Sequence, residues 1–192
     1  TIYFRVCGRE ICDAFIKGGR LMYQALYRKW RPTTFSQVVG QRHITDTLQR
    51  QVAEGRTGHA YLFTGTRGTG KTTCARILAK AINCLSPVDG APCNQCEACR
   101  GIDEGRLLDI TELDAASNNG VDNVLALRDE AVYSPSVLKQ RVYIYDEVHS
   151  RSTPSFNDQR NRMLQHPQRR SFFLSTTELP TFPPTIIPLC PR

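Results

Sequence analysis

The chain lacks any apolar run close to the about 18 residues that a membrane-spanning helix needs. Its N-terminal residues also lack the apolar core of a signal peptide. These absences predict a cytoplasmic protein without a membrane partner. The chain has eight cysteines, and without an export signal we expect them to be reduced or bound to metal rather than paired in disulfides.

Internal repeats and low-complexity tracts are also absent, which excludes repeat and fibrous architectures. At 192 residues, with 40% hydrophobic and 22% charged residues, the chain suits one soluble α/β domain with room for a small insertion. The net charge of +7 fits a polyanionic partner such as nucleic acid.

The most informative stretch is 65–72, GTRGTGKT, which follows the apolar run 60–63 and precedes a helical pattern. Its spacing, G-x-x-x-x-G-K-[ST], is that of a P-loop, in which backbone amides and a helix N-terminus face a phosphate. We expect Lys71 to reach the β- and γ-phosphates and Thr72 to hold Mg²⁺. A plain glycine-rich turn is the alternative, but such turns seldom carry Lys-Thr at this offset. The predicted nucleotide-binding residues are Gly65, Thr66, Arg67, Gly68, Thr69, Gly70, Lys71, Thr72 and Thr73.

Two further strands are predicted to end beside this loop. The strand 141–145 is followed by Asp146, expected to act on Mg²⁺ through water, and Glu147, expected to orient and deprotonate an attacking water. An exposed acidic turn is the alternative. The strand 171–175 leads to Thr176 and Thr177, whose hydroxyls either sense the γ-phosphate or are ordinary strand-end groups.

Four cysteines follow the P-loop helix at short spacing. Eight residues separate Cys84 from Cys93, and two residues separate each of the next pairs, Cys93 from Cys96 and Cys96 from Cys99. The prolines and glycine between the first two indicate a loop. This spacing favours a structural tetrahedral zinc site, with iron–sulfur ligation and unliganded thiols as the alternatives.

The arm at 27–39 is basic and aromatic. Its side chains suit either a strap that packs Trp30 and Phe35 on the domain or a pocket for adenine, and the residues alone leave both interpretations open. A helix with an apolar face at Ile44, Leu48 and Val52 is expected to end at Gly55. Further on, 107–113 is predicted to be a strand that leads to a helix capped by Ser117 or Asn118.

Together these motifs closely resemble the N-terminal ATPase region of the bacterial DNA polymerase III gamma/tau family, the motor of the sliding-clamp loader. The resemblance rests on YRKWRP at 27–32, VVGQ at 38–41, the P-loop, the four cysteines, DAASNNGVD at 114–122 and DEVH at 146–149. It covers about 22–150 strongly and 151–192 in outline. It implies an α/β P-loop AAA+ domain, with a five-stranded parallel sheet flanked by helices and an inserted four-cysteine zinc module at 84–99.

The resemblance also implies roles and partners. Arg28, Trp30, Pro32, Val38 and Val39 would border adenine and ribose, and Thr177 would be the sensor threonine, with Thr176 the next candidate. The cofactors would be ATP, Mg²⁺ and Zn²⁺. The partners would be the other clamp-loader subunits, the sliding clamp, and primed DNA gripped by its phosphate backbone. We expect 1–21 to be an extension outside the fold, 22–178 the ATPase domain and 179–192 a truncated tail.

The sequence departs from the family pattern after 150. Leu189 stands where the family has the arginine that reaches a neighbouring subunit's ATP, so hydrolysis by this chain is in doubt. Three other interpretations compete with a clamp-loader motor. They are a fragment similar to a DExH helicase, a small-molecule kinase with a zinc-bound lid, and a non-catalytic interaction module that binds nucleotide and zinc.

Overall fold

The computed structural model describes residues 30–114, 135, 137–148 and 169–178. The chain divides into two compact units, Thr1–Arg31 and Pro32–Arg192. Trp30, a described residue of the first unit, is 77% exposed. Among the residues that the structure describes, none of the helices has the length and apolar character to span a bilayer.

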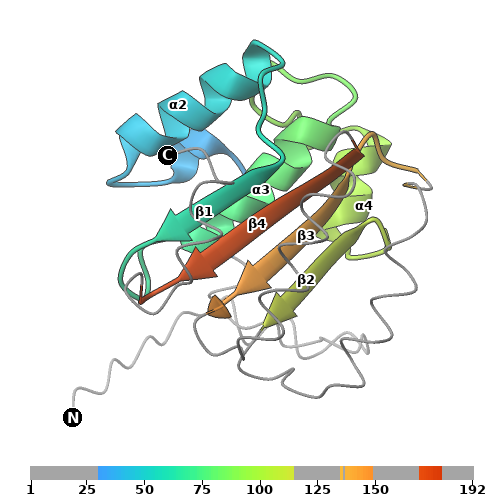
Figure 1. Ribbon diagram of the computed structural model, residues 1–192. Coiled ribbons are helices and arrows are strands. Elements are labelled where there is room, and N and C mark those ends of the chain that lie inside the picture. Colours follow the sequence, from blue (N-terminus) through green and yellow to red (C-terminus); the bar gives the residue numbers. More distant parts are fainter. Residues whose placement is uncertain (1–29, 115–134, 136, 149–168, 179–192) are drawn as a thin grey trace, which may run out of the picture. The chain divides into compact units, whose positions relative to one another are not determined.

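The described part of the second unit is a parallel sheet with helices (Figure 1). The sheet has the strand order β1-β4-β3-β2, and all three pairings are parallel. In chain order the elements are η3 (Phe35–Gln37), α2 (Arg42–Ala53), β1 (Ala60–Thr64), α3 (Lys71–Asn83), α4 (Glu97–Asp103), β2 (Ile110–Asp114), β3 (Arg141–Asp146) and β4 (Arg170–Thr176).

The strand register brings the carboxyl ends to one edge of the sheet. Thr64 at the end of β1 pairs with Thr176 of β4, and Asp114 of β2 pairs with Asp146 of β3. The loop that follows β1 therefore lies at the same edge as the acidic end of β3. Ligands of open parallel sheets bind at this kind of edge.

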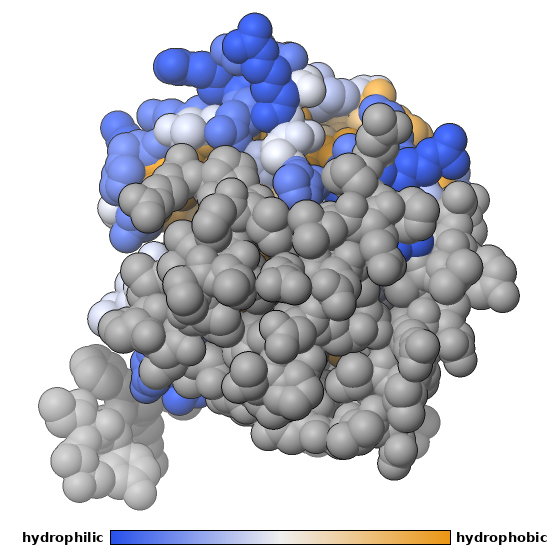
Figure 2. All heavy atoms as spheres, in the orientation of Figure 1, coloured by the Kyte–Doolittle hydropathy of each residue, from blue (hydrophilic) through white to orange (hydrophobic). Residues whose placement is uncertain are grey.

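The helices pack on one face of the sheet (Figure 1). Leu48 of α2 and Ile77 and Leu78 of α3 belong to a buried cluster that also includes apolar residues of β1, β3 and β4. Figure 2 shows hydrophilic residues over much of the outer surface of this helical layer, with hydrophobic residues visible between them. A second cluster lies on the other face, where the rings of Tyr143 and Phe172 stack with centroids 5.3 Å apart. Because both faces are apolar, the central strands β3 and β4 are buried along nearly their whole length.

An ion pair between a buried lysine and an exposed aspartate joins the P-loop helix to α4. Lys80 of α3 is only 3% exposed, and its Nζ donates to both carboxylate oxygens of Asp103, at 2.8 and 2.6 Å. Because a buried ammonium group is costly to leave without a partner, this pair fixes α4 against α3.

Most predicted elements are confirmed, and one boundary differs. The strand predicted at 107–113 begins only at Ile110, because the backbone turns before it, with the Ile110 amide donating to the Leu107 carbonyl at 3.3 Å. The helix predicted after Ser117 or Asn118 and the sequence after 178 lie outside the described residues, which contain four strands of the sheet. The predicted boundary at 21/22 also lies outside them and stays a prediction.

Candidate nucleotide site and four-cysteine cluster

The loop between β1 and α3 ends in a left-handed glycine. Gly70 is the N-cap of α3 with φ 88°, a conformation that glycine adopts without a steric penalty. The Nζ of Lys71, the first residue of α3, donates to the carbonyl oxygens of Gly65 (2.9 Å) and Thr66 (3.0 Å). The lysine ammonium therefore lies against the loop that the sequence assigns to phosphate.

Thr72 and Asp146, which are 74 residues apart in the chain, are in direct contact. The Thr72 hydroxyl donates to Oδ2 of Asp146 at 2.6 Å. The other carboxylate oxygen accepts from the Ser175 hydroxyl and, at 3.0 Å, from the Glu147 amide. Three elements, α3, β3 and β4, thus converge on one carboxylate.

These contacts set the charge state of Asp146. Burial by itself raises the pKa of this carboxyl. The hydrogen bonds from Ser175, Thr72 and the Glu147 amide, with the nearby Lys71 charge, outweigh burial and hold the pKa below its usual value. Asp146 is therefore an anion at neutral pH, as a ligand for a hard cation must be.

Glu147 lies beside Thr177. The backbone of Glu147 has φ 48°, unusual for a residue other than glycine, and the Thr177 hydroxyl donates to its Oε2 at 3.2 Å. Thr176 is fully buried, and its hydroxyl accepts from the Glu178 amide at 3.1 Å. Thr177 thus contacts an acidic residue that is predicted to be catalytic.

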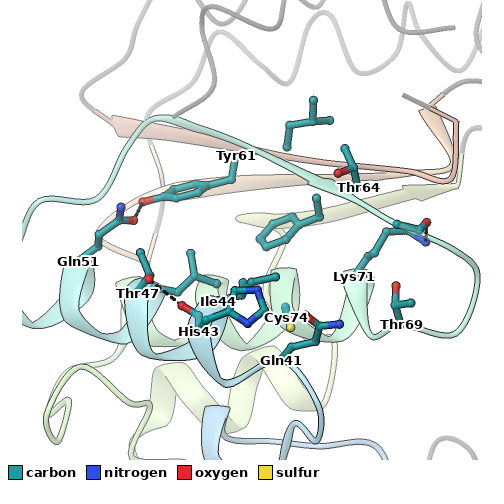
Figure 3. A pocket seen from close by; sticks show the side chains of 14 residues that line it. Gln41, His43, Ile44, Thr47, Gln51, Tyr61, Thr64, Thr69, Lys71 and Cys74 are labelled. Carbon is teal, nitrogen blue, oxygen red and sulfur yellow. Dashed lines mark hydrogen bonds between the residues drawn. The ribbon is translucent and has the colours of Figure 1, made fainter. Parts of the chain in front are cut away.

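A cavity of about 410 Å³ lies between α2, β1 and the P-loop (Figure 3). Lys71 and Thr69 lie at one end of it. At the other end are Gln51 and Tyr61, whose hydroxyl donates to Oε1 of Gln51 at 2.7 Å. Its wall between the two ends is mainly apolar. The lining residues are Gln41, His43, Ile44, Thr47, Leu48, Gln51, Tyr61, Leu62, Phe63, Thr64, Gly65, Thr69, Lys71 and Cys74.

The residues predicted to border adenine occupy different environments. Val38 packs with Phe35 in the core, whereas Val39 is 92% exposed. Neither these valines nor Pro32 is among the residues that line the cavity. Arg28 lies outside the described residues and Trp30 belongs to the other compact unit.

Sequence reasoning missed the wall that α2 contributes to this cavity. Ile44, Thr47 and Gln51 are three and four residues apart, so they share one side of the helix. Leu48 was predicted correctly as an apolar-face residue and is buried. The sequence carries no signal for this wall, because a helix side that mixes threonine and glutamine with isoleucine resembles an ordinary solvent-exposed surface.

The four cysteines form a compact cluster. The Sγ atoms of Cys84, Cys93, Cys96 and Cys99 all lie within 4.8 Å of one another, and the 84–96 and 93–99 pairs are each 4.0 Å apart. These distances exclude a disulfide and are close to the about 3.8 Å edge of a tetrahedron with zinc–sulfur bonds of about 2.3 Å. Cys84 caps the end of α3, and Cys96 and Cys99 lie at the start of α4.

Backbone amides point at the sulfurs. The Gln95 and Cys96 amides donate to Sγ of Cys93 at 3.5 and 3.3 Å and lower the pKa of that thiol to about 6. Burial instead raises the pKa of Cys84 and of Cys99. Burial alone would raise the pKa of Cys96, but hydrogen bonds that include the Leu85 and Cys99 amides outweigh it and lower that pKa. The donor set is four soft sulfurs, two of them with a lowered pKa, and this set is consistent with zinc.

The fold and the site together define a class of protein. A gamma subunit-related protein of DNA polymerase III from Thermotoga maritima superposes with a TM-score of 0.52 at 16% identity, covering 77% of this chain and 44% of that one. The RuvB Holliday junction branch migration motor of Thermotoga maritima gives 0.52 at 17% identity, covering 82% and 45%. These likenesses show the fold alone, which is that of a parallel α/β domain with a P-loop between β1 and α3.

The family model described as "DNA polymerase III, delta subunit" matches residues 40–191, and the chain belongs to this family. The chain is 50% identical over 173 residues to DNA polymerase III subunit tau of Bacillus subtilis. It is 44% identical to subunit tau of Escherichia coli and 42% identical to subunit gamma of Buchnera aphidicola from Acyrthosiphon pisum. These alignments cover 88–90% of the chain. The chain spans 31%, 26% and 46% of the lengths of these three relatives.

The hydrogen bond from Ser175 to Asp146 predicts a pH-dependent loss of stability. Because the folded-state pKa of Asp146 is lowered, its stabilisation is complete above the unfolded value of about 3.9 and is lost as the pH falls through the folded value. Ser175→Ala should cost about 1–2 kcal/mol at pH 7 in urea unfolding, and less near pH 3.

Ser171→Ala is the matched control, because this buried serine of β4 donates to the neutral Gln140 side chain at 2.7 Å. Its cost should be the same at both pH values. A Ser175→Ala deficit that does not change with pH would show that the serine does not stabilise a charged Asp146.

Proposed function

We propose that this chain is an ATP-binding and ATP-hydrolysing motor domain of the sliding-clamp loader of DNA polymerase III. The observation that carries the proposal is the contact between Thr72 and Asp146 beside Lys71. It places a hydroxyl, a carboxylate anion and an ammonium group around one point, as Mg²⁺ and a polyphosphate require. The family and its tau and gamma relatives support the same conclusion.

In this proposal the residues act on the triphosphate in distinct ways. Lys71 moves from the loop carbonyls to the β- and γ-phosphates, which are stronger acceptors. Thr72 and Asp146 would hold Mg²⁺, which neutralises phosphate charge when bound. Glu147 orients a water for attack on the γ-phosphate and accepts its proton. Thr177, which already contacts Glu147, senses the γ-phosphate through that carboxylate.

The cavity beside the P-loop supports a place for the nucleoside. It extends from Lys71 along α2, and its apolar wall at Ile44, Leu48 and Phe63 suits the faces of a purine ring. Glutamine side chains at 41 and 51 can pair with the polar edges of the base or with the ribose hydroxyls. The role of Arg28, Trp30, Pro32, Val38 and Val39 at the adenine stays a prediction, because Pro32, Val38 and Val39 do not line this cavity.

We assign zinc to the four cysteines as a structural ion. Four protein thiolates would complete a tetrahedron, which leaves no ligand position for a substrate. The cluster also lies at the C-terminal end of α3, whereas Lys71 begins that helix. The zinc would therefore stabilise the fold at a distance from the ATP chemistry.

The proposed partners are the other clamp-loader subunits, the sliding clamp and primed DNA, in the cytoplasm. A net charge of +7 suits contacts with the DNA phosphate backbone. Such contacts carry no base preference, as a loader that acts at any primed site requires.

The nucleotide assignment is tested through Lys71. A ligand that binds only the folded state stabilises it, by about 2.7 kcal/mol at 100 times its Kd. ATP with Mg²⁺ should therefore raise the melting temperature of the purified chain. Lys71→Ala should remove most of this shift, whereas Arg56→Ala, which deletes an exposed cation elsewhere, should keep it. An equal shift in the Lys71→Ala variant would place the ligand at another site.

The zinc assignment is tested by metal analysis of reduced protein. We expect about one zinc per chain, lost in Cys96→Ser. Cys74→Ser is the control, because Cys74 is a buried cysteine of α3 outside the cluster. Iron in place of zinc, or zinc retained by the Cys96→Ser protein, would refute the assignment.

Turnover is expected to be slow because Leu189 cannot supply the charge of the family's arginine. Such an arginine accelerates related phosphoryl transfers about 10³–10⁵-fold. The chain should bind ATP and hydrolyse it slowly. The hydrolysis rate per chain should not rise when the protein concentration is increased. Fast hydrolysis stimulated by primed DNA would show that another arginine, with Arg192 the first candidate, replaces it.

A further inference from the structure

The loop between Cys84 and Cys93 contains a tight turn at Asp89 and Gly90. Val88 and Ala91 flank it, and each donates its amide to the other's carbonyl, at 3.1 and 2.8 Å. The two central residues have φ 48° and 78°, the backbone of a two-residue turn in which Asp-Gly is strongly preferred. The dipeptide Asp-Gly was the available sequence signal for this turn.

This turn packs against the backbone of α2. The Gln49 side chain donates through Nε2 to the Asp89 carbonyl at 2.8 Å. Gly90 is buried, and a Cβ built on it would lie 2.0 Å from the Gln49 carbonyl oxygen and 3.0 Å from the Ala53 nitrogen. A glycine is therefore required here for two reasons. A side chain would collide with the backbone of α2, and the backbone has a positive φ.

The other side of α2 forms a wall of the nucleotide cavity. At about 3.6 residues per turn, Gln49 and Ala53 point away from Ile44 and Gln51, which line the cavity. A shift of the helix at the turn would move this wall toward or away from β1. A displacement at the Asp89–Gly90 turn would therefore change the width of the cavity.

The loop that carries the turn is itself anchored. Cys84 and Cys93 hold its two ends in the cluster. The Lys139 ammonium donates to the Cys84 carbonyl at 2.9 Å, and the Gln140 amide donates to Oδ1 of the buried Asn83 at 2.9 Å. With its ends fixed, the loop has little freedom to retreat from α2, so a change at the turn is transmitted to the helix.

We propose that Gly90 and Gln49 are positioning residues for the nucleotide cavity, through which the cysteine module holds α2 at its working distance from β1. The proposal rests on the proposed function, in that the cavity accepts ATP and the cysteines hold zinc. It gives the module a role in nucleotide affinity although none of its four cysteines is among the residues that line the cavity.

The main test compares Gly90→Ala with Gly105→Ala in the full chain. Both glycines have positive φ, but a Cβ at Gly105 meets nothing within 4 Å. We expect Gly90→Ala to bind ATP·Mg²⁺ about tenfold more weakly, because displacements near 1 Å already disturb ligand alignment. It should retain its zinc. Gly105→Ala should stay within about twofold of the unsubstituted chain, as a surface change does. Unchanged affinity in folded Gly90→Ala protein would overturn the proposal.

Gln49→Ala provides a milder variant should Gly90→Ala fail to fold. Loss of one hydrogen bond to the turn should weaken ATP binding about threefold, with zinc retained. If this variant binds ATP as the unsubstituted chain does, Gln49 has no positioning role.

Hydrogen exchange of α2 separates this proposal from the proposed function. If the unsubstituted chain binds no ATP, the proposed function fails, and exchange still reports on the packing. The amides near Ala53 should exchange faster in Gly90→Ala, or in Gln49→Ala if that protein is the one that folds, than in Gly105→Ala. Equal rates would contradict transmission from the turn to the helix.

Discussion

The hydrogen bond between Thr72 and Asp146 is the contact on which the site depends. It joins the first turn of α3 to the end of β3, which are 74 residues apart in the chain. It forms because the sheet is parallel, so that the loop after β1 and the end of β3 reach the same edge. Ser175, at the end of the strand between them, holds the second carboxylate oxygen. Thr72, Asp146 and Ser175 are thus held together by hydrogen bonds, and under the proposed function this preorganisation would reduce the entropic cost of binding Mg²⁺ and ATP.

The P-loop helix connects the two sites of the domain. Its first residue is Lys71, and Cys84 follows its last residue, Asn83. The ion pair of Lys80 with Asp103 and the hydrogen bond to Asn83 from Gln140, the residue before β3, fix the second half of this helix. The cysteine module is therefore built onto the end of a helix whose beginning we propose to bind phosphate, and it contacts α2 through the Asp89–Gly90 turn. If the cysteines hold zinc and the cavity accepts ATP, as we propose, this arrangement would let a structural ion influence affinity without contacting the ligand.

The sequence predicted well those features that depend on short-range spacing. The P-loop, the strand that ends at Asp146 and the cluster of four cysteines each follow from residue types at fixed offsets, and the fold class follows from their order. The cavity wall on α2 was not predictable in this way, because it depends on which side of a polar helix faces β1. The role of Val38 was left open between core and base, and the structure packs it in the core beside Phe35. Ser175 was placed at the end of its strand, but its hydrogen bond to Asp146 required the register of β3 with β4.

The most direct test of the account measures how much Mg²⁺ strengthens ATP binding in three versions of the chain. Thr72→Ser keeps the hydroxyl that donates to Asp146, and Thr72→Val removes it at almost the same size. We predict that the unsubstituted chain and Thr72→Ser gain affinity from Mg²⁺, and that Thr72→Val loses this gain. All three should bind ATP alike without the metal, since Lys71 is unchanged. A full Mg²⁺-dependent gain in Thr72→Val would contradict a metal site built on Thr72 and Asp146.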